Sequence, residues 1–479
     1  MTNNSAAKKS PEGAVLQRVG AAGRKFDVKT VWVLSSLLAL AALTVPALLA
    51  PTVQTASPAP NEAGASPPPA IGPALTTVSF TFDSGRSSQL VAAATLKKEG
   101  MRGTFFVNSG FLQEPGYMGV DDLHTLVADG NEIGGHTVTL ADLSIITGDE
   151  AIRQVCSDRS NLADLGFKVA SFAYPFGAVT PAAENQVAAC GYNSARSSAD
   201  IRSPFGCADC DVAESVRPAD PFRTRSVVEI GNTWNLTNLQ QVVTAAEGSG
   251  GWLQLVFYDI DDSGSPRSIT PQLFKDFAEW LAPRSEGKST AVRTVHEVIG
   301  GAVKPAVAGP SAPPAPPGVN AVKNPGLESA GRYGLPQCWQ VSSYGESNPS
   351  LSILTPGRSG TIARRLDVNG YKSGDAKLLP TLDLGECSPS VAAGHAYTVS
   401  AWYTSTAPTQ FELYYRNKAG TWTYWTASPW FAATSGYQQA RWTTPAVPAD
   451  AVGLSFGLNL FSNGQLATDD YEMLDAGTP

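Results

Sequence analysis

Three residues that could do acid–base or metal chemistry follow strand-like segments in the first half of the chain. Asp83 comes directly after the strand-like run at 77–82. His136 follows a short extended segment, and Tyr258 lies near the end of an apolar run. Parallel α/β and barrel folds place their active sites at the carboxyl ends of strands. We therefore expect these side chains to meet at one site.

The segment 76–302 alternates strand-like and helix-like patterns. Strands are predicted at 77–82, 103–108, 132–135, 169–174 and 252–260, and helices at 88–99, 120–128, 148–165, 181–190, 236–247 and 271–281. The last predicted strand is almost continuously apolar, as in a buried parallel strand. This order predicts an α/β fold with a parallel sheet, open or closed into a barrel.

Four motifs in this segment occur in one order along the chain. They are TFDS at 81–84, HTVTL at 136–140, YPFG at 174–177 and LVFYD at 255–259. Together they resemble the polysaccharide deacetylases of the NodB-homology type (carbohydrate esterase family 4), over about 76–301. The resemblance implies a distorted (β/α) barrel that hydrolyses N- or O-acetyl groups of a glycan. It also implies a divalent metal, often zinc, held by one Asp and two His, with an Asp as base and another His as acid.

The metal-binding positions of the family are only partly conserved in this sequence. Asp83 lies at the position of the catalytic base, and Ser84 replaces the metal-binding aspartate. His136 matches the first metal histidine, whereas Leu140 stands at the second. Leu140 cannot bind a metal, and a catalytic zinc needs about three protein ligands.

The remaining positions of the resemblance concern the acetyl carbonyl and the catalytic acid. The backbone amide that helps to polarise the carbonyl would be that of Phe176, and Ala173 lies near the place of the family's arginine. Tyr258 stands at the position of the catalytic-acid histidine. A tyrosine with an ordinary pKa near 10 is a slow proton donor at neutral pH.

Three hypotheses follow for this domain. The first is a family member that binds cell-surface or extracellular polysaccharide with weak or no hydrolysis. The second is an active metal-dependent deacetylase with a rearranged site. The third is a surface scaffold or adhesion protein. The sequence leaves the enzymatic activity and the identity of the glycan open.

The segment 321–479 has a different pattern, typical of an all-β domain. Strands are predicted at 397–403, 410–415, 422–426, 438–443 and 452–460, separated by Gly, Pro, Asn and Ser. The pattern indicates a jelly-roll-like β-sandwich that resembles carbohydrate-binding modules. Its aromatic candidates for stacking on sugar rings are Trp422, Tyr424, Trp425 and Trp430. About half of the aromatic residues in this cluster are expected in the core.

The two ends of this second domain carry acidic residues that resemble a structural calcium site of such modules. Glu328 lies in NPGLE near its start, and Asp470 lies in DDY near its end. Carboxylate oxygens are suitable calcium ligands. We expect these two residues to be the matching donors.

The N-terminal part predicts export and anchoring. Residues 31–50 form a run of 20 uncharged, mostly apolar residues after a basic segment. A helix of that length spans a bilayer core, and the basic flank predicts a cytoplasmic N-terminus. We therefore expect a cytoplasmic tail at 1–29, a single transmembrane signal anchor at 30–50 and a Pro/Ala-rich linker at 51–75. A cleaved signal peptide is the alternative.

Cysteine content and charge support an extracytoplasmic location. The chain has six cysteines, of which Cys338 and Cys387 are predicted to pair because they are alone in the second domain. The other four allow three pairings, although a loop disulfide is favoured for CADC at 207–210. A formal charge of −8 argues against nucleic-acid binding. A second Pro-rich linker is expected at 303–320.

Overall fold

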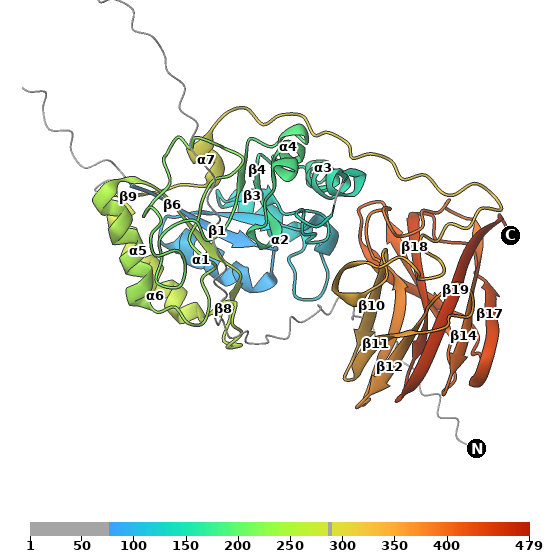
Figure 1. Cartoon of the computed structure of the whole chain (residues 1–479). Coiled ribbons are helices and arrows are strands. Elements are labelled where there is room, and N and C mark those ends of the chain that lie inside the picture. The colour runs from blue at the N-terminus through green and yellow to red at the C-terminus, as the bar shows by residue number, and fades with distance from the viewer. Residues whose placement is uncertain (1–75, 147, 286–289) are drawn as a thin grey trace, which may run out of the picture. The chain divides into compact units, whose positions relative to one another are not determined.

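The computed structural model describes residues 76–146, 148–285 and 290–479, which form an α/β region and an all-β region (Figure 1). The predicted tail, signal anchor and first linker at 1–75 lie outside these residues. Within the described ranges, no helix has both the length and the apolar character needed to cross a bilayer.

A curled parallel sheet forms the centre of the α/β region, in the strand order β5-β4-β3-β2-β1-β6, with β9 also paired to β1. The strands are β1 (Thr76–Asp83), β2 (Gly103–Val107), β3 (Glu132–Gly135), β4 (Ser171–Ala173), β5 (Ser194–Arg196), β6 (Gly251–Phe257) and β9 (Thr290–Val292). The predicted parallel sheet is confirmed. The predicted strand at 252–260 is interrupted at Tyr258, after which the chain forms β7 (Asp259–Ile260), which pairs with β8 (Ser268–Ile269).

An irregular segment at 221–230 joins the two ends of this sheet. On one side, the backbone of Thr224 exchanges hydrogen bonds with β5 and with Ser197. On the other side, the N–H groups of Val227 and Ile230 donate to carbonyls of β6. These hydrogen bonds close the sheet into a barrel. The barrel is distorted because the closing segment is not a regular strand.

Helices surround the sheet (Figure 1). They are α1 (Leu90–Lys98), α2 (Val120–Ala128), α3 (Gly148–Asp164), α4 (Pro181–Ala189), α5 (Leu236–Ser249), α6 (Pro271–Ser285) and α7 (Val295–Ile299). Phenylalanines fill the layer between β1 and the helices, and the rings of Phe82 and Phe105 stack with centroids 4.5 Å apart. Burial of such rings is the main stabilising contribution in this layer.

The alternation of β1 explains why Asp83 faces the barrel interior. Phe80 and Phe82 belong to the hydrophobic core between sheet and helices. Ser79 and Thr81 alternate with them and are fully buried. Their hydroxyls donate to the carbonyl of Arg293, directly after β9, and to that of Leu255 in β6. Because side chains alternate along a strand, Asp83 lies on the same face as these polar residues.

The first residues of the predicted second linker are held by the barrel. Arg159 in α3 is 2 % exposed and donates hydrogen bonds to the carbonyls of Lys304 and Pro305. The ammonium of Lys304 donates to the Tyr192 carbonyl, and the Ser160 hydroxyl donates to that of Val307. The Pro-rich segment is therefore not a free spacer over its whole length.

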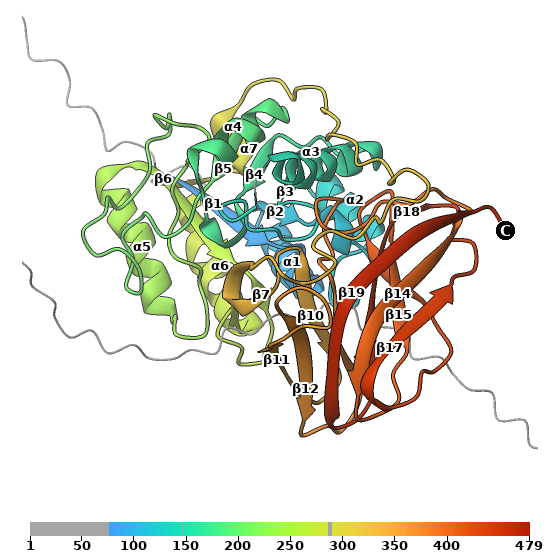
Figure 2. The same cartoon turned by 45° about the vertical axis from the view of Figure 1, so that its right-hand side comes forward.

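The all-β region consists of two antiparallel five-stranded sheets, ordered β10-β13-β18-β15-β16 and β11-β12-β19-β14-β17 (Figure 2). The strands are β10 (Trp339–Tyr344), β11 (Asn348–Leu354), β12 (Ala363–Asn369), β13 (Asp375–Pro380), β14 (Ala396–Ser405), β15 (Phe411–Asn417), β16 (Trp422–Ala427), β17 (Thr434–Thr443), β18 (Ala451–Leu460) and β19 (Gly464–Gly477). The predicted sandwich is confirmed, although the four strands from β10 to β13 and the last strand were not predicted.

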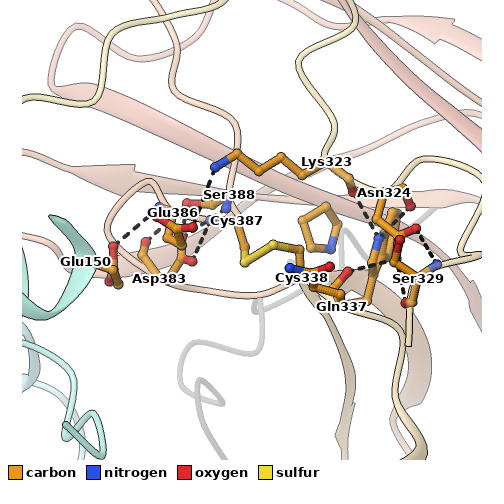
Figure 3. Close-up of a disulfide and its surroundings, with 12 residues drawn as sticks. Glu150, Lys323, Asn324, Ser329, Gln337, Cys338, Asp383, Glu386, Cys387 and Ser388 are labelled. Carbon is orange, nitrogen blue, oxygen red and sulfur yellow. Dashed lines mark hydrogen bonds and ion pairs between the residues drawn. A yellow bond between two sulfur atoms is a disulfide. The ribbon is translucent and has the colours of Figure 1, made fainter. Parts of the chain in front are cut away.

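Three disulfides connect the six cysteines: Cys156–Cys190, Cys207–Cys210 and Cys338–Cys387. The predicted pairing of Cys338 with Cys387 and the loop disulfide are both confirmed. Figure 3 shows the Cys338–Cys387 bond beside Asp383, whose carboxylate accepts hydrogen bonds from the N–H groups of Cys387 and Ser388. The disulfide thus links the start of β10 to a turn already ordered by its own side chain.

Candidate functional site

The carboxylate of Asp83 is paired with a buried arginine. Asp83 is 8 % exposed, and Arg196 at the end of β5 is 1 % exposed. The Nη2 atom of Arg196 donates to Asp83 Oδ1 at 2.5 Å, and its Nη1 atom donates to the Ser197 carbonyl. The guanidinium carbon lies 5.4 Å from the ring centre of Phe106. A full positive charge therefore neutralises the candidate base inside the barrel.

Arg196 was not found from the sequence, because it lies outside the four motifs. The missing arginine was expected near Ala173 on β4. In the sheet, Ala173 and Arg196 are register partners on the neighbouring strands β4 and β5. The cation next to Asp83 thus comes from one strand further along, at the same level of the barrel.

His136 is held in one tautomer at the end of β3. It is 2 % exposed, and its Nδ1 lies 2.7 Å from the Ala173 carbonyl oxygen. Because a carbonyl can only accept, Nδ1 carries the proton and Nε2 keeps its lone pair. Burial lowers the pKa of His136, although the nearby Asp83 acts in the opposite direction. The ring is therefore neutral near pH 7 and able to accept a proton or bind a metal through Nε2.

Asp158 in α3 positions the backbone of His136 and was also missed by the motif comparison. Its two carboxylate oxygens accept the N–H groups of Ser109 and His136, both at 2.9 Å. Asp158 is fully buried, and this burial raises its pKa to about 7. The only sequence signal was an acidic residue inside a helix that otherwise packs on the sheet.

The loop that follows His136 has an unusual backbone conformation, although Leu140 replaces the second metal histidine. Thr137 and Leu140 both have positive φ angles, 67° and 57°. Such values cost a non-glycine residue about 1–2 kcal/mol. The Asn108 side-chain amide donates to the carbonyls of His136 and Thr137, which compensates for part of this cost. The loop shape is thus maintained while the side chain at its end is apolar.

The residues present do not fit a zinc ion. Asp83 is engaged by Arg196, Ser84 offers a neutral hydroxyl, and Leu140 has no donor atom. The Ser84 hydroxyl is buried without a hydrogen-bond partner. Across 76–146, 148–285 and 290–479, no group of three or more His, Cys, Asp or Glu side chains could hold a metal. We therefore derive no chemical step through a metal.

Tyr258 lies at the carboxyl end of β6, beneath a second arginine. Its ring is 2 % exposed, and the guanidinium carbon of Arg267 lies 3.6 Å from the ring centre. Arg267 also forms an ion pair with Glu229 in the segment that closes the barrel. The Gln89 amide donates to the backbone carbonyls of both Asp83 and Tyr258, at 2.7 Å each, and so ties the two strand ends together.

Phe176 lies on the loop after β4, in a strained conformation. Its φ and ψ are 61° and 9°, and its side chain is 64 % exposed. Two residues earlier, the Tyr174 N–H donates to the Arg196 carbonyl. This loop therefore follows directly on the strand end that neighbours the Asp83–Arg196 pair. The predicted role of the Phe176 amide stays a prediction.

The four aromatic candidates of the sandwich differ in exposure. Trp422 is 3 % exposed, packs against Leu379, and donates its indole N–H to the Asp383 carbonyl. Trp425 is half-buried against the core. Tyr424 and Trp430 are 48 % and 55 % exposed. Only the last two present a wide aromatic surface for a ligand.

Glu328 and Asp470 meet at the loop 358–362. Glu328 Oε1 accepts the N–H groups of Thr361 and Ile362. Asp470 accepts from the Ser359 hydroxyl at 2.5 Å and forms an ion pair with Arg358. The predicted calcium donors are thus close to one loop and already have protein partners.

Comparisons with known proteins find similarity in parts of this chain. Residues 73–195 match the family model for polysaccharide deacetylase. No curated protein matches the chain. Among solved structures, the Xyl-CE4 domain of a xylanase from the hindgut metagenome of Trinervitermes trinervoides is 18 % identical, covers 47 % of this chain and 89 % of its own, with a TM-score of 0.31.

Two further structures are similar to one region each. The peptidoglycan deacetylase PdaC from Bacillus subtilis is 14 % identical over 48 % of this chain and 92 % of its own, with a TM-score of 0.30. TmCBM61, solved with β-1,4-galactotriose, is 15 % identical over 33 % of this chain and 99 % of its own, with a TM-score of 0.23. Residues 73–195 are thus similar to the polysaccharide deacetylase family, and the C-terminal part of the chain forms a β-sandwich.

Proposed function

We propose that this protein is a membrane-anchored, extracytoplasmic member of the polysaccharide deacetylase family that binds cell-surface glycan and hydrolyses acetyl groups weakly or not at all. The two replaced metal-ligand positions, Ser84 and Leu140, carry this proposal. At this site only His136 remains of the metal ligands that the family resemblance implies. The barrel is otherwise complete, so the losses affect the chemistry and leave the fold intact.

The chemistry of acetyl hydrolysis explains why these losses matter. A water molecule must lose a proton to a base, and the carbonyl oxygen must meet a positive charge or hydrogen-bond donors as it becomes negative. His136 supplies a neutral Nε2 as a base. Arg196 is the nearest cation to Asp83, but it is already bonded to Asp83 and to the Ser197 carbonyl. The site therefore offers a better group for accepting the proton than for stabilising the oxyanion.

Acetate release by the purified full-length chain tests this proposal. The substrates are acetylated peptidoglycan and chito-oligosaccharides, with zinc, cobalt or no added metal. We expect binding of the glycan without metal-dependent release. Release that depends on metal and is lost in Asp83→Asn would support an active deacetylase with a rearranged site instead.

The β-sandwich is proposed to add carbohydrate binding. Tyr424 and Trp430 support this role, because exposed flat rings stack on the apolar faces of sugars. Trp430→Ala is expected to weaken glycan retention severalfold, measured by affinity electrophoresis in gels that contain the polysaccharide. Unchanged retention would leave Tyr424 as the remaining candidate of this pair.

Two further parts of the proposal concern the anchor and calcium. Residues 30–50 are proposed to hold the protein in the membrane with the N-terminus in the cytoplasm. Retention in the membrane pellet after alkaline extraction tests this.

Glu328 and Asp470 are proposed as calcium donors, and a higher Tm with calcium than with chelator is the expected result.

A further inference from the structure

The turn between β15 and β16 of the sandwich packs against the barrel, and both regions belong to one compact unit of the chain. The Asn161 amide of α3 donates to the Ala419 carbonyl of this turn at 2.7 Å. Glu150 of α3, drawn in Figure 3, accepts the Leu384 N–H of the sandwich at 2.8 Å. The two regions thus share a boundary at which side chains of both can form a site.

A cavity of about 270 Å³ lies at this boundary. Its apolar lining includes Val138, Leu384 and Val452, and the Pro-rich segment contributes Pro310 and Ala312. This volume is below the ~300–1,000 Å³ of sites that hold drug-sized ligands, so the cavity suits a small ligand such as one sugar unit.

Among the residues that the structure describes, the charged side chains that line this cavity are all cationic. They are those of Arg153, Arg416 and Lys418. Arg153 is already paired with Glu150, at 3.2 Å. Arg416 and the exposed Lys418 form no ion pair with any described residue. The cavity therefore presents two positive charges that the protein itself does not neutralise.

Arg416 differs from ordinary buried arginines because it lacks a hydrogen-bond acceptor. It is 7 % exposed, and its Nε atom is buried without a partner. Its guanidinium carbon lies 5.9 Å from the ring centre of Trp422, and no residue in the described part of the chain accepts a hydrogen bond from the guanidinium. Burying a charge without a partner is strongly unfavourable. The side chain therefore needs an acceptor that the cavity can admit.

The carboxylates that act electrostatically on Arg416 are bonded to other donors. Asp383 accepts backbone N–H groups of its own turn at 385–388. Glu150 accepts from Arg153 and from the same turn. Burial lowers the pKa of Arg416, although Asp383 and Glu150 act in the opposite direction. Because an arginine keeps its proton at neutral pH, the cavity has a permanent positive charge.

We propose that this cavity binds the carboxylate of an acidic sugar unit in the glycan, with Arg416 as a bidentate donor and Lys418 as a second positive charge. The planar fork of a guanidinium matches the two oxygens of a carboxylate. The apolar lining provides contacts for the sugar ring, and Ser157 adds a hydroxyl. The charge favours an acidic sugar over a neutral one. The inference rests on the proposed glycan-binding function and adds the chemical class of sugar that the chain selects.

Calorimetric titration of the full-length chain with three probes tests this inference. They are a β-1,4-glucuronic acid tetramer, a β-1,4-glucose tetramer and inorganic phosphate, all at the same ionic strength. The two tetramers differ in the carboxylate, and phosphate supplies an oxyanion without a sugar. We expect the acidic tetramer to bind at least about tenfold more tightly than the other two, and less tightly as the salt concentration rises.

Variants of the cationic side chains locate the binding. Arg416→Met should weaken binding of the acidic tetramer at least about tenfold and remove the preference over the neutral one. Because this variant removes an unpaired buried charge, its Tm should not fall. Lys418→Ala should weaken binding of the acidic tetramer severalfold. Lys372→Ala, at a sandwich lysine outside the cavity whose side chain is 76 % exposed, is the matched control and should bind like the unmodified chain.

The outcomes separate this inference from the function on which it rests. Equal affinity for the two tetramers, or a preference that persists in both Arg416→Met and Lys418→Ala, overturns the carboxylate selection and leaves glycan binding intact. Phosphate that binds as tightly as the acidic tetramer and displaces it assigns the cavity to a free oxyanion and also overturns the inference. If neither tetramer nor the wall glycans bind, the proposed function fails as well. Should Arg416→Met not fold, Lys418→Ala decides.

Discussion

The barrel and the sandwich each bury an ion pair, but the two differ in their balance of charge. At the barrel site one carboxylate, Asp83, faces one guanidinium, that of Arg196. On the sandwich face two carboxylates, Asp375 and Glu412, share the ammonium of Lys377. The barrel pair is neutral and leaves little demand for a further cation. In the sandwich cluster, burial raises the pKa of Asp375 to about 7, so the two carboxyls can share a proton as well as the ammonium.

The two arrangements differ in how their charge balance responds to pH. In the barrel, a permanent positive charge, that of Arg196, lies next to the candidate base, since an arginine does not lose its proton near neutral pH. In the sandwich, the raised pKa of Asp375 makes the charge of the cluster depend on pH. The first arrangement keeps its charges throughout the neutral pH range, and the second changes its charge near neutral pH.

The largest expected effect comes from restoring the expected ligands in the barrel. The triple variant Ser84→Asp, Leu140→His, Tyr258→His should bind zinc stoichiometrically, because it regains one Asp and two His at the matched positions as well as a histidine for proton transfer. Metal content after dialysis measures this. If a folded triple variant gains no zinc, the residue correspondences with the family are wrong.

Removal of the lysine should be the most destabilising single change. Lys377→Met leaves two buried carboxylates without a cation, and we expect a loss of about 3–5 kcal/mol in the free energy of unfolding. Because protonation removes the repulsion between the carboxylates, the loss should shrink as the pH falls. Denaturant titrations at pH 5 and pH 8 test both statements. A loss that does not change with pH would show that packing of the aliphatic stem dominates.

Arg196→Ala should destabilise the barrel by less, about 3 kcal/mol, because only one carboxylate is left without its partner. Asp83→Ala in the same chain removes that orphan charge and should recover part of the loss. A double-mutant cycle measured by chemical unfolding gives the coupling. Coupling below about 0.5 kcal/mol would contradict the role assigned to this pair.

Asp158→Asn should change how the free energy of unfolding depends on pH more than it changes that free energy at a single pH. The pKa of Asp158 is raised to about 7 in the folded state, above the unfolded value near 4, so the folded protein holds an extra proton between these values. Its stability therefore falls as the pH rises through this window, by up to about 1.4 kcal/mol per pH unit. The asparagine variant should lack this slope in unfolding curves from pH 4 to pH 8. An unchanged slope would assign it to other groups.

The smallest effect is expected for the loop disulfide. Cys207 and Cys210 are 3 residues apart, whereas Cys156 and Cys190 are 34 apart. Because loop entropy grows with loop length, replacing the first pair by serine should cost about 2 kcal/mol and replacing the second about 4. Unfolding of the two double-serine variants compares them. A larger loss for the short loop would mean that it orders the neighbouring segment.

Local patterns predicted the elements better than they predicted the contacts. The strands that end at Asp83 and His136 were found because apolar periodicity and turn residues are local signals. Arg196 was missed because its contact with Asp83 spans 113 residues of sequence. The alternation of Asp375 and Lys377 with Ala376 and Leu378 was visible in the sequence. The strand at 375–380 was nevertheless not predicted, since the strands before 396 have fewer aromatic residues and shorter regular runs.

The strap of linker backbone held by Arg159 shortens the segment that joins the barrel to the sandwich. The last carbonyl of this strap belongs to Val307, and the sandwich begins at Asn320, whose side chain bonds to β19. In an extended Pro-rich form, the intervening dozen residues span about 35–40 Å. Under the proposed function, that tether keeps a polysaccharide bound by the sandwich at high effective concentration for the barrel, so that two weak contacts on one chain of sugar act as a single strong one.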